Sequence, residues 1–102
     1  MVAITAGTQA QVNGPSLSIN TVYTWASNVE TNAIRASVNG ADAGTVDTAA
    51  TLPTITSLVI GHNGANAVPF LGSIRHAMFF SGSHDQTTLN TLTATLQALY
   101  GA

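Results

Sequence analysis

The sequence predicts a mostly-β domain that ends in one α-helix. Residues 33–46 alternate apolar and polar side chains on both sides of Asn39-Gly40, a dipeptide typical of tight β-hairpins. Residues 70–80 form the most apolar stretch of the chain, and leucines then recur at helical spacing. Since the chain has 102 residues, we expect a single domain.

The N-terminal part of the chain is expected to supply strands. Residues 1–12 begin with β-branched side chains and are typical of an edge strand. Residues 17–27, LSINTVYTWAS, are predicted as the next strand, and residues 28–32 as a polar loop.

The strand that follows the polar loop has two distinct faces. Alternation places Ile34, Ala36 and Val38 on one face of the strand. Arg35 and Ser37 lie on the other face. The sequence therefore predicts a strand with one apolar and one polar face.

Three further strands complete the predicted sheet. Residues 43–48 return from the Asn39-Gly40 turn as a weak strand, and residues 57–61 form a short buried one. Residues 70–80, FLGSIRHAMFF, carry bulky side chains on both faces, so we expect this strand to be covered on both sides.

The C-terminal segment predicts a helix over about 84–100. Ser83 and Gln86 have capping-box spacing, Asp85 lies in the first turn, and Gly101 follows as a stop. Threonine is frequent here and is a poor helix former, so the helix should depend on docking. One apolar stripe is predicted to make that contact with the core: Leu89, Leu92, Leu96 and Leu99.

Four sequence motifs and the closing helix occur in an order that resembles a known family. The motifs are NTVYTW at 20–25, IRASVNG at 34–40, LVIG at 58–61 and FLGSIRHAMFF at 70–80. Together they resemble the C-terminal half of a laminin-G-like or concanavalin A-like lectin jelly roll. The resemblance covers residues 17–100 and implies an antiparallel, jelly-roll-like β-sandwich.

Members of that family are usually much longer than this chain. Residues 1–102 are therefore predicted to form a partial or minimal lectin-like sandwich, which would leave an apolar face and open edges exposed. The chain is a fragment, a compact version, or a subunit whose neighbours cover the missing face. Its neutral, Ala- and Thr-rich character resembles modules of phage virion proteins such as tail fibres and capsid decorations, which implies a virion or extracellular location.

The charge of the chain excludes several partners. It has two Lys and Arg residues in total against four Asp and Glu, with a net charge of −2, so we expect no binding to nucleic acid or to anionic membranes. We expect neither a transmembrane segment nor a signal peptide. Weak self-repulsion favours assembly with copies of itself or with other structural subunits.

The acidic residues argue against an enzyme. Glycoside hydrolysis needs two paired carboxylates, but Glu30 is the only glutamate and lies in the predicted loop. Asp42, Asp47 and Asp85 are expected at a hairpin, a strand end and a helix start, which separates them. The sequence also lacks the Gly-x-Ser-x-Gly motif of serine hydrolases.

Metal and cofactor sites are not expected either. The chain has no cysteine, and His76 and His84 have no third ligand near them in the sequence. Laminin-G-like modules often bind calcium, and Asp42 and Asp47 flank a hairpin as possible ligands. Solvation of that hairpin is the favoured role for both carboxylates.

Carbohydrate binding is the alternative function that the residues suggest. Trp25 is a candidate aromatic platform, and the loop over residues 62–67 supplies His62, Asn63 and Asn66 as hydrogen-bonding partners. Trp25 as a core or interface residue, and the asparagines as turn residues, are the competing interpretations.

The sequence therefore predicts a non-enzymatic structural module of a larger assembly, with a phage virion as the expected setting. The alternative is a lectin-like adhesion module that binds a glycan through the residues just named.

Overall fold

The structure is a computed structural model, and it describes residues 2–5, 8–52, 54 and 71–101. Two antiparallel sheets and one helix make up the described part of the chain. In chain order, these elements are β1 (Val2–Thr5), β2 (Thr8–Val12), β3 (Trp25–Glu30), β4 (Ala33–Val38), β5 (Ala41–Asp42) and α1 (Gln86–Tyr100).

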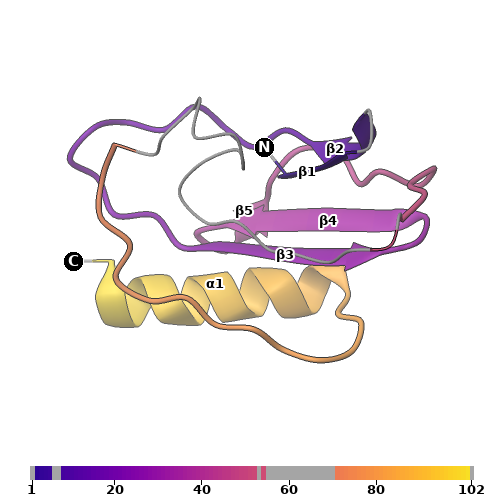
Figure 1. The fold of residues 1–102 in the computed structure, drawn as a ribbon. Coiled ribbons are helices and arrows are strands. Elements are labelled where there is room, and N and C mark those ends of the chain that lie inside the picture. Colours follow the sequence, from indigo (N-terminus) through magenta and orange to yellow (C-terminus); the bar gives the residue numbers. More distant parts are fainter. Residues whose placement is uncertain (1, 6–7, 53, 55–70, 102) are drawn as a thin grey trace.

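The elements lie in three layers (Figure 1). The central layer is a three-stranded sheet in the order β3-β4-β5, with every pair antiparallel. The β1-β2 hairpin lies over one face of this sheet, and α1 lies across the other face. An antiparallel sheet with a C-terminal helix is the arrangement that the sequence predicts.

The apolar face of β4 carries the core. Ile34 is completely buried and Val38 nearly so, and both pack with Val12 at the end of β2. The predicted alternation along β4 is confirmed, because Ser37 on the opposite face bonds to α1. The buried apolar cluster consists of Val12, Ile34, Ala36, Val38, Ala43 and Ala50.

The β4-β5 connection is the two-residue turn that the sequence predicts. Asn39 and Gly40 have φ angles of 51° and 88°, and Val38 pairs directly with Ala41. Positive φ at both turn positions matches the right-handed twist of the strands. The strand predicted over 43–48 is wrong, because the return strand β5 comprises Ala41–Asp42 alone. Beyond it, the chain bonds to β4 through the Ala43 N–H, which donates to the Ala36 carbonyl at 3.0 Å, and through a bridge from Asp47.

The strand predicted at 17–27 is wrong over most of its length. Strand β3 begins at Trp25 and continues to Glu30, through residues that were predicted as a loop. The hairpin closes instead at Asn32, whose φ of 59° places it in the left-handed region that asparagine tolerates. Before β3 the chain is irregular, and there the Ser18 N–H donates to the Tyr23 hydroxyl at 3.0 Å.

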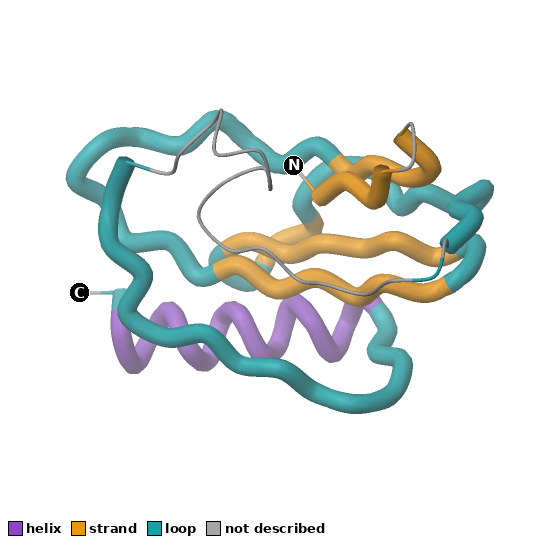
Figure 2. Tube along the Cα trace, viewed as in Figure 1, coloured by secondary structure: helices purple, strands orange, loops and turns teal. Residues whose placement is uncertain are grey.

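Residues 71–80 depart most from the prediction. No residue of this segment is in a strand, and every one of them is exposed, so the expectation of a strand covered on both sides is wrong. The segment runs beside α1, from the end of the helix back to its beginning (Figure 2). We call residues 71–80 the apolar strap. The predicted strand at 57–61 lies outside the described residues.

The helix forms where predicted, with a different cap. Asp85 is the N-cap, and its carboxylate accepts a hydrogen bond of 2.7 Å from the Thr88 N–H, so Ser83 does not cap the helix. Gly101 ends the helix as expected. Among the described residues, no helix is long and apolar enough to cross a membrane.

The helix docks through polar side chains rather than through its leucine stripe. The face of β4 that meets α1 carries Ser37, and Thr93 is fully buried against it, with 2.8 Å between the two hydroxyl oxygens. The Gln86 side-chain amide donates to the Ala36 carbonyl at 2.9 Å. Of the four leucines, Leu89 alone is buried, whereas Leu99 is 66% exposed and the other two are half-buried.

We expect Thr93→Val to lower the free energy of unfolding by about 1–3 kcal/mol. The substitution keeps the shape of the side chain but removes the oxygen that serves Ser37 and the Gly40 N–H. Urea denaturation measures the difference. Thr95→Val is the matched control, because within the described residues the exposed Thr95 hydroxyl bonds only to the Thr91 carbonyl. Equal losses of stability in both variants would contradict the polar docking.

Candidate assembly surface

The apolar strap is attached to the rest of the chain at its middle and at its C-terminal end. Near the end of α1, the Arg75 guanidinium donates to the Tyr100 carbonyl at 2.9 Å, and the His76 ring lies 4.5 Å from the Tyr100 ring. Near the start of α1, the rings of Phe80 and His84 meet edge to face with centroids 6.3 Å apart. These contacts hold the strap alongside the helix.

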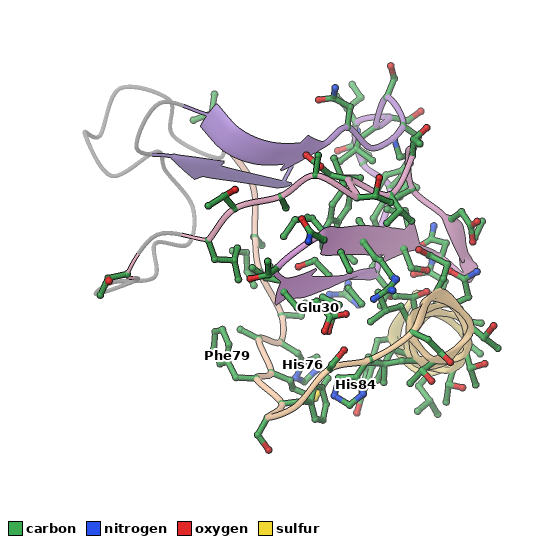
Figure 3. The ribbon with its side chains drawn as sticks, turned by 90° about the vertical axis from the view of Figure 1, so that its right-hand side faces the viewer. Glu30, His76, Phe79 and His84 are labelled. Atoms are coloured by element: carbon green, nitrogen blue, oxygen red, sulfur yellow. The ribbon has the colours of Figure 1, made fainter. Side chains whose placement is uncertain are left out.

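The large apolar side chains of the strap are turned toward solvent. Figure 3 shows the Phe79 ring pointing away from both the sheet and the helix. The exposed fractions are 91% for Leu71, 52% for Ile74, 50% for Met78, 69% for Phe79 and 60% for Phe80. Five large exposed apolar side chains within ten residues are unusual on an isolated domain, and such exposure is typical of an interaction surface.

The layer between the strap and the sheet explains this orientation. Glu30 and Arg35 form an ion pair of 2.9 Å there, at the closed end of the β3-β4 hairpin. In Figure 3, Glu30 lies between the sheet and the strap, near His84. Burying apolar rings against this pair would strip water from two charges, so the polar layer disfavours an inward orientation of the rings.

A second set of hydrogen bonds fixes the chain where the strap meets the helix. The backbone N–H of His84 donates to the Asn28 side chain at 2.9 Å, and Asn28 is buried. The Arg35 guanidinium also donates to the His84 carbonyl at 3.4 Å. The start of α1 is therefore bonded to β3 and β4 independently of the strap.

Two carboxylates at this end of the molecule have lowered pKa values. The hydrogen bond from the Ser83 side chain lowers the pKa of Glu30 most, and the bond from Arg35 lowers it further. The pKa of Asp85 is lowered chiefly by its hydrogen bond from the Thr88 backbone. Both groups favour the folded state when they are ionised.

Acidification is expected to destabilise the fold through these carboxylates. Because their pKa values are lower in the folded chain, their stabilisation is complete above the ordinary values of 4.5 and 3.8 and is lost as the pH falls through the folded values. Melting temperatures measured from about pH 7 down to about pH 2 should therefore fall less for Glu30→Gln than for the native chain. Parallel curves for the two proteins would contradict a role for Glu30.

Of the residues predicted to bind carbohydrate, Trp25 alone lies in the described part of the chain. Trp25 is the first residue of β3 and is 37% exposed. Part of its ring lies against the Gly14 backbone, where an added Cβ would stand 2.7 Å from the ring atom Cη2. The other predicted residues, His62, Asn63 and Asn66, lie outside the described part of the chain.

The described residues contain no group of three or more histidine and acidic side chains placed to hold a metal ion. The two aspartates considered for calcium have protein partners. Asp42 accepts a hydrogen bond of 2.6 Å from the Asn90 side chain, and Asp47 accepts one of 2.9 Å from the Ala49 N–H.

Sequence reasoning missed the polar layer beneath the strap. Asn28 and Arg35 are directly paired in the antiparallel register, and Glu30 lies two residues beyond Asn28 on β3, where it pairs with Ala33. Alternation along β4 already placed Arg35 on the polar face of the sheet. Its partner Glu30 could not be identified from the sequence, because β3 extends through residues that were predicted as a loop.

Comparisons of the chain with protein-family models, with curated proteins and with solved structures gave no match.

Proposed function

We propose that this chain is a structural subunit that joins further copies of itself through the apolar strap. The observation that carries the proposal is a run of large apolar side chains held outward over a polar layer. Within the described part of the chain these side chains remain largely exposed, and a second copy supplies the same kind of surface.

The area of the strap supports an interface between copies. A phenylalanine contributes about 150–250 Å² when buried, and the strap exposes most of two such rings together with three aliphatic side chains. The side chains offer on the order of 600 Å², against about 800 Å² that each partner contributes to an interface of standard size. The strap therefore supplies most of one interface.

The charge of the chain also favours a second copy as the partner. The strap carries one ionised side chain, Arg75, which already donates to the Tyr100 carbonyl. With a net charge of −2 over the whole chain, two copies repel each other only weakly.

We further propose the fold and the biological setting that the resemblance to lectin-like jelly rolls implies. A β-hairpin stacked on a three-stranded sheet is a small two-sheet arrangement, and we take it as a minimal version of the jelly-roll-like β-sandwich. A particle built of many copies, such as a phage virion, is the setting in which such a subunit would serve. The glycan-binding alternative keeps Trp25 as its candidate platform.

Sedimentation velocity across a concentration series tests the proposal. We expect the native chain to self-associate and Phe79→Glu to dissociate into monomers, with binding weakened about tenfold or more. The substitution removes an exposed ring and places like charges across the interface. Because Phe79 is exposed, the variant should melt at the native temperature.

Thr91→Glu is the matched control for this experiment. It introduces the same charge at an exposed position of α1, outside the strap, and should leave self-association unchanged. A native chain that stays monomeric at every concentration would refute the proposal, as would equal dissociation of the two variants.

A further inference from the structure

The turn between β4 and β5 contains a chemically reactive pair of residues. In an Asn-Gly sequence the glycine nitrogen can attack the side-chain carbonyl carbon of the asparagine, because glycine has no side chain to shield the approach. Asn39-Gly40 is such a pair, and its residues occupy a tight turn in direct contact with α1.

Hydrogen bonds restrain both reacting groups. The nitrogen of Gly40 donates its proton to the Thr93 hydroxyl at 2.8 Å, and Thr93 is fully buried. The Asn39 side-chain oxygen accepts a bond of 2.8 Å from the Thr24 N–H, and the Asn39 N–H donates to the Thr24 carbonyl at 3.0 Å. The attacking nitrogen is therefore tied to α1, and the attacked carbonyl is tied to the residue that precedes β3.

The helix also closes the space above the turn. A Cβ added at Gly40 would lie 2.8 Å from the Cβ of Ala94, so α1 packs directly against this glycine. The attack requires the peptide group of Gly40 to rotate toward the Asn39 side chain. That rotation breaks the bond to Thr93, and the packed helix leaves little room for it.

We propose that Asn39 is a deamidation site that docked α1 keeps closed. When the helix lifts, the Gly40 nitrogen forms a bond to Cγ of Asn39 as the Cγ–Nδ2 bond breaks. The Gly40 amide proton leaves with the side-chain nitrogen, which departs as ammonia, and a cyclic succinimide remains. Water then adds to one of its two carbonyl carbons and opens the ring to aspartate or isoaspartate, so water is the only co-reactant.

The product opposes redocking of the helix. Isoaspartate inserts a methylene group into the backbone of a turn that depends on φ angles of 51° and 88°. Either product also adds a negative charge to the turn, in a chain whose net charge is already −2. Lifting of α1 would thus be recorded permanently in the covalent structure of the turn.

Peptide mapping by mass spectrometry after timed incubation tests the proposal. Asn39 in the folded native chain should convert at least about tenfold more slowly than Asn39 in the same chain unfolded in urea. In the folded state, Thr93→Val should speed conversion about tenfold, and Thr93→Ser, which restores a hydroxyl, should slow it again.

Thr95→Val is the control, because it makes the same change on the same helix away from the turn, and its rate should equal the native one. Equal conversion of Asn39 in the folded and unfolded native chain would overturn the proposal, and this comparison requires no variant. Equal rates for folded Thr93→Val and the folded native chain would overturn it as well.

Discussion

Replacing Ile34 by alanine is expected to lower the free energy of unfolding by about 2–5 kcal/mol. Ile34 is 0% exposed and is the second residue of β4, where it packs in the buried cluster with Val12. The substitution removes apolar surface and leaves a cavity that small neighbours such as Ala36 cannot fill. Small domains have total stabilities of about 5–15 kcal/mol, so this single change removes a large share.

Urea denaturation followed by circular dichroism measures this loss, and Ile19→Ala is its matched control. Ile19 is 89% exposed, so the same chemical change there should cost no more than about 0.5 kcal/mol. Similar losses at both positions would contradict the placement of the core between β4 and the N-terminal hairpin.

A second large effect is expected for Gly44→Ala. Gly44 has a φ of +73°, a conformation that costs an L-residue about 1–2 kcal/mol. An added Cβ would also overlap the Asn13 carbonyl oxygen and lie 3.1 Å from a Val12 methyl group. Because the overlapping atom belongs to the Asn13 backbone, the segments that follow β2 and β5 must move apart. The loss in the free energy of unfolding should therefore clearly exceed the conformational cost alone.

Gly82→Ala separates the two contributions to that loss. Gly82 has a similar φ of +89°, but nothing lies within 4 Å of an added Cβ. Its substitution should cost about 1–2 kcal/mol, the conformational cost alone. If thermal denaturation shows that Gly44→Ala and Gly82→Ala lower the stability equally, the close approach of Gly44 to the Asn13 backbone adds nothing to the cost of the substitution at Gly44.

Local patterns predicted the centre of the fold because local chemistry determines it. Alternation along 34–38 assigns the two faces of β4, and Asn39-Gly40 suits a turn that needs positive φ at both positions. The same holds for the helix, whose leucine period predicted its extent to within two residues.

The face through which the helix docks could not be predicted from the helix itself. The apolar face of β4 is already covered by β2 and by residues 43–50, so α1 meets the polar face. There Thr93 and Gln86 form hydrogen bonds to β4 that a leucine side chain cannot form. The composition of one element does not reveal which face of its neighbour remains free.

The strap was mispredicted for a related reason. Its apolar composition normally indicates burial, but burial requires an apolar partner. The partner surface here is the ion pair of Glu30 and Arg35, which exists only because β3 continues through the predicted loop. The candidate carbohydrate residues His62, Asn63 and Asn66 remain a prediction.

Hydroxyl-radical footprinting at high and low protein concentration tests, at the level of single residues, whether a second copy of the chain covers the apolar strap. We expect Met78, Phe79 and Phe80 to be oxidised rapidly in dilute solution and protected at high concentration, while Trp25 reacts equally in both. Rapid oxidation of the strap at both concentrations would contradict the proposed self-association.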